Sequence, residues 1–291
     1  MNLVYSLPKP LIKAKVIARP SKKVKSPYLA DILINDVEYL CHSAPLGCSG
    51  HIVEGSTVWV LEKEKSKVKV QSTHEIYLIE ENNVLIGCHH LVANKIAHEM
   101  LKKQLLFPNT TNIVPEQTFG GSRFDFSAKS DNNTLIIEVK SVPITDYIDG
   151  TTKEVQSYLK EHPSYNEKIA IFPYCTTAGK RKVSKEPLSE RALKHVLELT
   201  NLANSNKVLE STNLANSNKV LEPTNLANSN KCTLLFIVQR NDVSKFCVTK
   251  LDATYKEACK KALEAGVNIK AISIRWDNQH AYYTKDLEIV W

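Results

Sequence analysis

Two short segments constrain the fold of this chain most, because together they predict a β-hairpin with charged side chains at one end. Residues 115–126 and 135–140 are rich in aromatic and β-branched residues, which strands favour. The polar residues 129–133 between them can turn the chain. Pairing the two strands brings Asp125 close to Glu138 and Lys140. Positions 138 and 140 project from the same face of their strand, so the pattern predicts that two carboxylates and one ammonium converge.

Such a group of side chains is typical of a metal-dependent phosphodiesterase site. Carboxylate oxygens suit Mg²⁺ or Mn²⁺, and a neighbouring lysine can orient water or stabilise phosphate charge. A bare Glu-x-Lys is common on exposed strands, where it is only a solvated charged face. Here residues 135–137 are all apolar, which indicates a central strand of an open α/β sheet with its site beyond the strand ends. We therefore expect Asp125 and Glu138 to hold the metal ion, with Lys140 beside it.

Composition places the chain among ordinary globular proteins. Its 291 residues, 43% hydrophobic and 24% charged, are enough for one large or two medium domains. The sequence contains no apolar run of about 18 residues and does not open with a basic-then-apolar leader, so we expect neither a membrane span nor a secretory signal. Seven scattered cysteines favour free thiols in a reducing compartment, and we expect a cytoplasmic protein.

Basic residues are unevenly distributed along the chain, whose net charge is +7. The first 30 residues carry lysines and arginines but no acidic residue, and a second basic group lies at residues 180–185. Such clusters favour a polyanion, because binding releases its condensed counterions. The alternative is a surface that only keeps the protein soluble.

The pattern of apolar runs divides the chain into two expected domains. Residues 1–86 contain short β-like runs that predict a small all-β barrel, with strands near 11–18, 28–34, 37–41, 57–61, 67–70 and 76–78. Residues 87–291 predict an α/β sheet with helices on its faces. The helices are expected at 91–106, 188–199 and 253–265, and the strands at 113–119, 124–128, 134–139, 232–239 and 267–274.

A repeat of period twelve interrupts the second domain at about residues 201–231. The unit is too polar to bury a stacked core, and known solenoid repeats are longer. We therefore interpret it as an expansion within a mobile surface loop.

Several blocks of the sequence resemble the sugar fermentation stimulation protein family, and the match covers most of the chain outside the repeat. The most specific block joins Glu116, Gly121, Arg123 and Asp125 to the Glu138-Val139-Lys140 tripeptide. Weaker blocks surround His42, the Asn94 and Glu99 pair, and the Lys194-His195 dipeptide.

This resemblance implies an N-terminal oligonucleotide-binding-like (OB-like) β-barrel joined to a PD-(D/E)XK, restriction-endonuclease-like α/β domain. It also implies binding to DNA, or to RNA, mostly through phosphates, and a suspected nuclease activity that uses Mg²⁺ or Mn²⁺. The expected catalytic residues are Asp125, Glu138, Lys140, Glu116 and Glu99. The expected nucleic-acid contacts are Arg123, Arg19, Lys22, Lys23, Lys25, His42, Asn94, Lys194 and His195.

Three alternatives stay open at this stage. The chain can be a DNA-binding regulator that keeps the carboxylate pocket without catalysis. Arg123 can grip a phosphate through its planar fork, or it can pair with Glu116 or Asp125 as part of the structure. His195 can contact phosphate or relay a proton, or it can be a capped or surface histidine.

Overall fold

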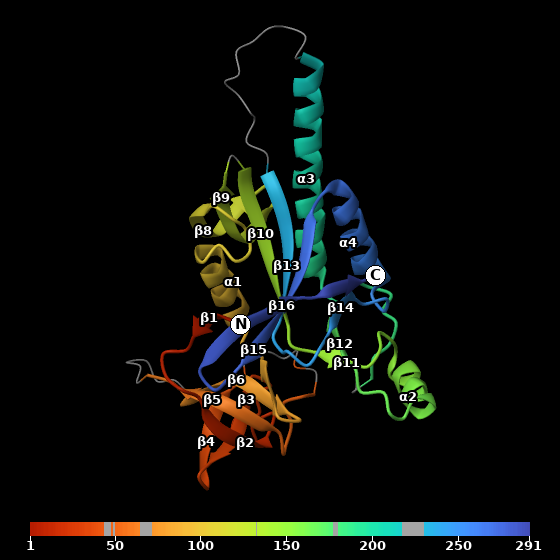
Figure 1. Cartoon of the computed structure of the whole chain (residues 1–291). Coiled ribbons are helices and arrows are strands. Elements are labelled where there is room, and N and C mark those ends of the chain that lie inside the picture. The colour runs from red at the N-terminus through yellow and green to blue at the C-terminus, as the bar shows by residue number, and fades with distance from the viewer. Residues whose placement is uncertain (44–47, 49, 65–71, 132, 177–179, 217–229) are drawn as a thin grey trace.

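The computed structural model describes residues 1–291 except 44–47, 49, 65–71, 132, 177–179 and 217–229. Of residues 206–216 it describes the backbone alone. In this part of the chain the strands form three sheets, and helices cover both faces of the largest one (Figure 1).

The first sheet closes on itself to form a barrel in the lower part of Figure 1. Its order is β4-β3-β2-β5-β6-β7, and parallel pairing of Cys41 with His74 joins β4 to β6. The strands are β2 (Ile12–Ala18), β3 (Leu29–Ile34), β4 (Val37–His42), β5 (Thr57–Glu62), β6 (His74–Glu81) and β7 (Val84–Gly87). Alternate apolar side chains such as Val16, Ile32 and Val58 fill the interior. The expected all-β character of this region is confirmed, while the strand expected at 67–70 lies outside the described residues.

The large sheet has the order β1-β16-β15-β13-β10-β9-β8. Its strands are β1 (Asn2–Ser6), β8 (Thr110–Phe119), β9 (Ser122–Ser130), β10 (Asn133–Val142), β13 (Asn230–Val238), β15 (Asn268–Trp276) and β16 (His280–Asp286). The central strands β10, β13 and β15 run parallel, and the flanking pairs are antiparallel. Parallel strands are covered on both faces, and Leu135, Ile136 and Ile137 are accordingly buried.

β1 departs from the expected domain division. It pairs with β16 of the large sheet, so the barrel strands begin at β2 rather than at the first residue. The boundary expected at residue 86 itself stays a prediction.

Helices cover the two faces of the large sheet (Figure 1). α1 (Val92–Lys102) packs on one face, while α3 (Glu190–Asn216) and α4 (Ala253–Ala265) pack on the other. α4 matches the expected helix because Asp252 caps its start and Gly266, with φ +98°, ends it. None of the helices in the described ranges is long and apolar enough to cross a membrane.

α3 corrects the interpretation of the repeat. The helix expected to end at residue 199 continues to Asn216, so the first part of the repeat is helical rather than a loop, and Figure 1 shows α3 projecting beyond the sheet. Residues 201–216 contain leucine, alanine, lysine and glutamate, which extend a helix readily once it has begun. The repeat's residues 217–229 lie outside the described part.

A smaller sheet packs beside the large one, in the order β11-β12-β14-β17. Its strands are β11 (Thr145–Asp146), β12 (Ile169–Phe172), β14 (Lys245–Val248) and β17 (Glu288–Val290). Helix α2 (Thr152–Glu161) lies next to it and begins with a capping box, in which Thr151 and Glu154 bond each other's backbone N–H groups. The sequence analysis did not predict α2, although this Thr-x-x-Glu spacing is a recognised start signal.

Candidate functional site

Asp125 lies where strands β9 and β10 part. The last residues in register are Phe126 and Ile137. Beyond them the N–H of Val139 donates to Asp125 Oδ2 at 2.7 Å, so a side chain replaces the backbone acceptor of the ladder. Asp125 Oδ1 accepts a second hydrogen bond from Asn94 Nδ2 of α1, also at 2.7 Å. The carboxylate is therefore held by β10 on one side and by α1 on the other.

Glu138 is the most deeply buried acidic group of the site, with 2% of the residue exposed. Its Oε1 accepts hydrogen bonds from Lys140 Nζ on the same strand and from His195 Nδ1 on α3. Its Oε2 is also buried, and no described residue donates a hydrogen bond to it. An unpartnered buried carboxylate oxygen is costly, so this atom is a strong candidate to bind a cation or a ligand donor.

The environments of the two carboxylates move their pKa values in opposite directions. Burial, followed by the charge of Glu138, raises the pKa of Asp125 above its ordinary value. Burial alone would also raise the pKa of Glu138. However, the hydrogen bond from His195 and the charge of Lys140 outweigh burial and lower the Glu138 pKa. Near neutral pH the site therefore contains a firmly ionised Glu138 beside a carboxylate that benefits from a nearby positive charge.

The predicted convergence of Asp125, Glu138 and Lys140 is thus confirmed as geometry. Ile137 and Val139 pack towards α1, whereas Ile136 packs towards α3, so successive residues of β10 face opposite sides of the sheet. The described residues contain no group of three or more His, Cys, Asp or Glu side chains placed to share an ion. A cation here would rest on two carboxylates, completed by main-chain oxygens and water.

Two expected nucleic-acid contacts belong to the carboxylates instead. Asn94 bonds Asp125, and His195 is buried against Glu138 rather than exposed as a phosphate contact. The surface-histidine alternative for His195 is wrong, whereas its position fits the proton-relay alternative. The family motif located both residues, but only the packing of α1 and α3 on the sheet reveals their partners.

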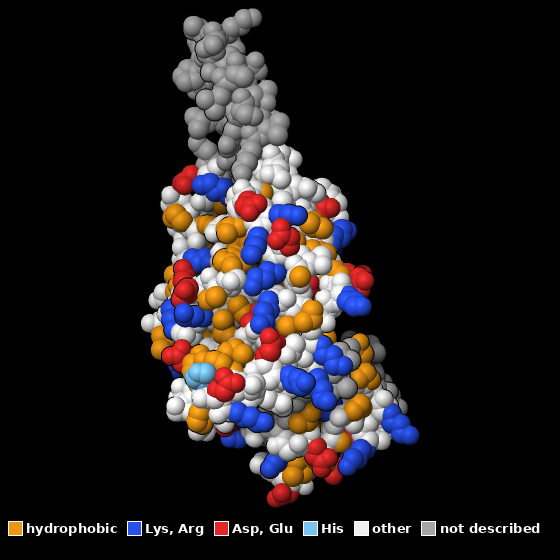
Figure 2. Space-filling view, turned by 90° about the vertical axis from the view of Figure 1, so that its right-hand side faces the viewer, with side chains coloured by type: hydrophobic (Ala, Val, Ile, Leu, Met, Phe, Trp, Pro, Cys, Tyr) orange, Lys and Arg blue, Asp and Glu red, His pale blue; other side chains and the backbone are white. Residues whose placement is uncertain are grey.

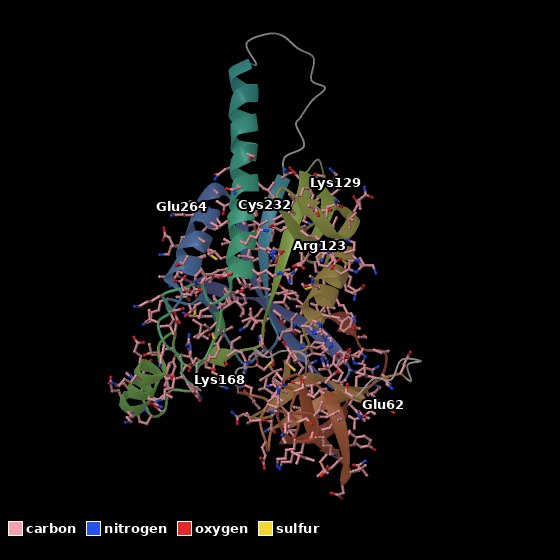
Figure 3. The ribbon with its side chains drawn as sticks, turned by 180° about the vertical axis from the view of Figure 1, so that it is seen from behind. Glu62, Arg123, Lys129, Lys168, Cys232 and Glu264 are labelled. Carbon is pink, nitrogen blue, oxygen red and sulfur yellow. The ribbon has the colours of Figure 1, made fainter. Side chains whose placement is uncertain are left out.

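Glu116 and Arg123 pair with each other on neighbouring strands, at 3.5 Å, and both side chains are mostly exposed. The structural-pairing alternative for Arg123 therefore describes this structure, and Figure 3 shows the residue on β9. Glu99 lies on α1 and pairs with Lys102 at 2.9 Å. The described contacts do not bring Glu116 or Glu99 to the carboxylates of Asp125 and Glu138, so the geometry gives no support to catalytic roles for them.

The expected basic contacts lie in different environments. Lys22, Lys23, Lys25 and Lys194 are exposed, although Lys23 pairs with Glu38 at 2.9 Å. Arg19 instead is half-buried in the barrel, where its guanidinium approaches the Ile52 carbonyl oxygen at 3.5 Å. Burial lowers the pKa of Arg19. Arg19 is therefore a barrel residue rather than part of an exposed basic arm.

His42 is partly exposed and lies next to a carboxylate. Its Nδ1 lies 3.0 Å from Glu75 Oε1, and His89 Nε2 approaches the same oxygen at 3.2 Å. The His89 ring stacks on Tyr77 with ring centres 4.2 Å apart. The expectation that His42 contacts nucleic acid directly is therefore not supported by its place in the fold, because its described partner is Glu75.

Glu75 gives a prediction about acid stability. The imidazoles of His89 and His42, His89 first, lower the pKa of Glu75 to about 2 from an ordinary value of 4.5. A carboxylate with a lowered pKa stabilises the fold above the unfolded-state value, and this contribution is lost as the pH falls towards the folded value. Between pH 5 and pH 2 we expect the wild type to lose about 2 kcal/mol more stability than Glu75→Gln, as urea unfolding would show. Glu38→Gln, an exposed barrel variant, should follow the wild type, and identical pH profiles for all three proteins would refute this account.

Glu198, which lies one turn after His195 on α3, was not among the expected site residues. A Cβ at Gly121 would stand 3.0 Å from Glu198 Oε1, so the Gly120-Gly121 turn has glycine where α3 approaches closely. The i, i+3 spacing of His195 and Glu198 was the available signal, since such residues share a helix face.

Comparison with known proteins connects the chain to one family. The model of the sugar fermentation stimulation protein RE domain matches residues 91–209 and 218–280. A sugar fermentation stimulation protein homolog of Clostridium botulinum (strain Langeland) is 27% identical over 268 residues, which cover 90% of each chain. The homolog of Clostridium perfringens (strain 13) is 26% identical over 283 residues, 96% of each chain.

A solved structure gives the same picture of the fold. The structure of Pyrococcus furiosus SfsA in complex with Ca²⁺ covers 100% of both chains with a TM-score of 0.71 at 18% sequence identity. The fold and the carboxylate site define a mixed α/β protein, built mostly from sheets, with a buried glutamate and a half-buried aspartate at a strand end. The chain belongs to the sugar fermentation stimulation protein family.

Proposed function

We propose that this protein binds nucleic acid and hydrolyses its phosphodiester bonds with a divalent cation held by Asp125 and Glu138. The observation that carries the proposal is the convergence of these carboxylates with Lys140, together with the buried and unpartnered Oε2 of Glu138. The proposal includes an OB-like character for the closed barrel sheet and a PD-(D/E)XK character for the large sheet and its helices. Such a nuclease places two acids and one lysine on adjoining strands, as β9 and β10 do here.

The residues present fit a divalent cation. Asp125 and Glu138 supply hard oxygen donors, and the charges and hydrogen bonds around them keep Glu138 ionised. The related protein that was solved with Ca²⁺ supports a divalent ion, and Mg²⁺ or Mn²⁺ is the proposed catalytic choice. When bound, a Mg²⁺ ion would polarise the phosphodiester and lower the pKa of a coordinated water.

The remaining side chains of the site orient the two carboxylates and can stabilise charge on the phosphate. Asn94 fixes the orientation of the Asp125 carboxylate through its 2.7 Å hydrogen bond. Lys140, whose side chain is 13% exposed, can leave Glu138 to orient water or to stabilise charge on the phosphate. His195 holds Glu138 in place through Nδ1.

The exposed lysines Lys22, Lys25 and Lys194 support binding through phosphates without sequence preference. DNA is the proposed polyanion, with RNA as the alternative. A specific observation also favours a second candidate function, that of a non-catalytic DNA-binding regulator. Lys140 and His195 both already bond Glu138 Oε1, an arrangement that can stabilise the fold without any reaction.

Labelled DNA separates the two candidates. Single- and double-stranded substrates are incubated with the protein and Mg²⁺, Mn²⁺ or EDTA, and products are resolved on a denaturing gel. We expect cleavage with Mg²⁺ or Mn²⁺ and none with EDTA. Binding should weaken about 10-fold or more between 50 and 200 mM salt, since several phosphates are contacted. Salt-sensitive binding without cleavage under any of these conditions would favour the regulator instead.

A further inference from the structure

A pocket opens beside the smaller sheet, on the side of the molecule that carries α2, α4 and the C-terminal strand. Its volume is about 390 Å³, which is within the range of small-ligand sites. Three aromatic residues line it: Tyr147, Tyr165 and Trp291. Figure 2 looks onto this side, where Lys and Arg side chains follow one another down the middle of the face.

Lysines from three parts of the chain meet at the same pocket. They are Lys168 beside β12, Lys245 and Lys250 around β14, and Lys256 in the first turns of α4. Figure 3 shows Lys168 low in the molecule, well away from Arg123 on β9. The pocket is thus built from other elements than the Asp125–Glu138 pair.

The residues that line the pocket carry more positive than negative charge, which favours an anion. Its two acidic lining residues are Asp149 and Glu167. The Asp149 carboxylate is already used, because it accepts hydrogen bonds from Arg181 Nη2 at 3.2 Å and from the Lys250 N–H at 2.6 Å. Lys256 has no ion-pair partner among the residues that the structure describes.

Two of the other lysines, Lys245 and Lys250, form exposed ion pairs. Lys250 pairs with Glu154 at 3.1 Å and Lys245 with Glu288 at 3.4 Å, and about half of each lysine side chain is exposed. Exposed pairs of this kind contribute little stability, so the lysines can turn to a phosphate at small cost. Lys168 is more enclosed and lies 3.5 Å from Asp242.

Aromatic rings continue outward from the pocket along α2. Tyr165 meets Tyr158 edge to face with ring centres 5.1 Å apart, and Tyr158 stacks on His162 at 4.3 Å. Flat rings beside flexible cations match a ligand that has both an aromatic base and a phosphate, since bases stack on aromatic side chains in most strand-binding proteins.

We propose that this pocket binds a nucleotide unit, with the base against Tyr147, Tyr165 and Trp291 and the phosphate at Lys250 and Lys256. The unit can come from a free mononucleotide or from a single strand that passes over α2. The inference goes beyond the proposed cleavage site and does not require it.

The test uses the full chain in EDTA and follows tryptophan emission during titration with deoxyadenosine monophosphate (dAMP). Parallel titrations use deoxyadenosine, inorganic phosphate and a short single-stranded oligodeoxynucleotide. We expect dAMP to quench Trp291 and Trp291→Phe to lose this signal. Trp276 is buried in the core, and Trp59 lies outside the pocket in the barrel, where its indole N–H donates to Glu80. Lys256→Ala should weaken binding about 10-fold, because a charged hydrogen bond is lost. Lys260→Ala, an exposed lysine on the same helix outside the pocket, should bind as the wild type does.

Each outcome decides the proposal. Quenching by the oligonucleotide but not by dAMP, with the same Lys256 dependence, supports the site and assigns it to a strand. Equal binding of inorganic phosphate and dAMP overturns it, as does equal binding by Lys256→Ala and Lys260→Ala, or no quenching at all. The titration is done in EDTA, so it does not depend on metal-dependent cleavage. If the protein binds the nucleotide but never cleaves DNA, the pocket proposal stands and only the cleavage proposal fails.

Discussion

Glu138→Gln is expected to abolish metal-dependent DNA cleavage, with a loss of at least about 10³-fold, or several kcal/mol of transition-state stabilisation. Glutamine keeps the shape of the side chain and can still accept the hydrogen bond from His195. It removes the negative charge that would hold the cation and the partner that keeps Lys140 in place. The measurement is the single-turnover cleavage rate of labelled DNA over a Mg²⁺ titration.

A matched control lies on the neighbouring helix. Glu99→Gln makes the same chemical change at a residue that pairs with Lys102 and does not touch the carboxylate pair. Its cleavage rate should remain within about 3-fold of the wild type, as is usual for an exposed surface pair. If Glu99→Gln reduced cleavage as much as Glu138→Gln, the assignment of the site to Asp125 and Glu138 would be wrong. If Glu138→Gln stayed active, Glu138 would not be a ligand of the catalytic cation.

Arg240→Ala is expected to destabilise the fold by about 3–5 kcal/mol, because it removes a buried guanidinium and leaves the partly buried Asp242 carboxylate only Lys168, at 3.5 Å. Arg240 is 1% exposed, and it bonds Asp242 through Nε at 2.6 Å and Nη2 at 2.7 Å. Its Nη1 also lies 3.6 Å from Glu81 on the barrel strand β6. The Arg240 guanidinium thus connects the barrel to the large sheet. Chemical denaturation followed by circular dichroism measures the loss in free energy of unfolding.

Two further variants test that explanation. Arg191→Ala removes an exposed arginine of α3 and should change stability by no more than about 0.5 kcal/mol. Pairing Arg240→Met with Asp242→Leu removes both charges and should recover part of the stability, since replacing a whole buried pair by apolar residues is often neutral. A stability loss for Arg240→Ala no larger than that for Arg191→Ala would contradict the proposed connection.

The sequence predicted the central hairpin and its charged residues well, because local patterns determine both. The apolar run 135–137 identifies a covered strand, and period-two alternation places residues 138 and 140 on one face. Helix α4 was predicted to the residue, since Asp252 and Gly266 mark its two ends. The strand that the sequence expected at 113–119 is also present, as the longer β8.

What the sequence could not provide depends on contacts between distant elements. Asn94 and His195 lie 31 and 57 residues from their carboxylate partners, so only the packing of α1 and α3 brings them together. Arg19 and His42 were expected to contact nucleic acid, but in the barrel they lie next to Ile52 and Glu75. The helical start of the repeat was not predicted, because its polar composition is typical of a loop, although its leucine, alanine, lysine and glutamate residues extend α3.

Diffraction from crystals soaked in Mn²⁺ tests the central claim most directly, because the anomalous signal of manganese locates the ion without reference to activity. The account predicts a peak between the carboxylates of Asp125 and Glu138, within about 2.0–2.6 Å of an oxygen from each, with Lys140 turned away from Glu138. A fully occupied manganese elsewhere in the molecule, with Lys140 and His195 still bonded to Glu138, would contradict it.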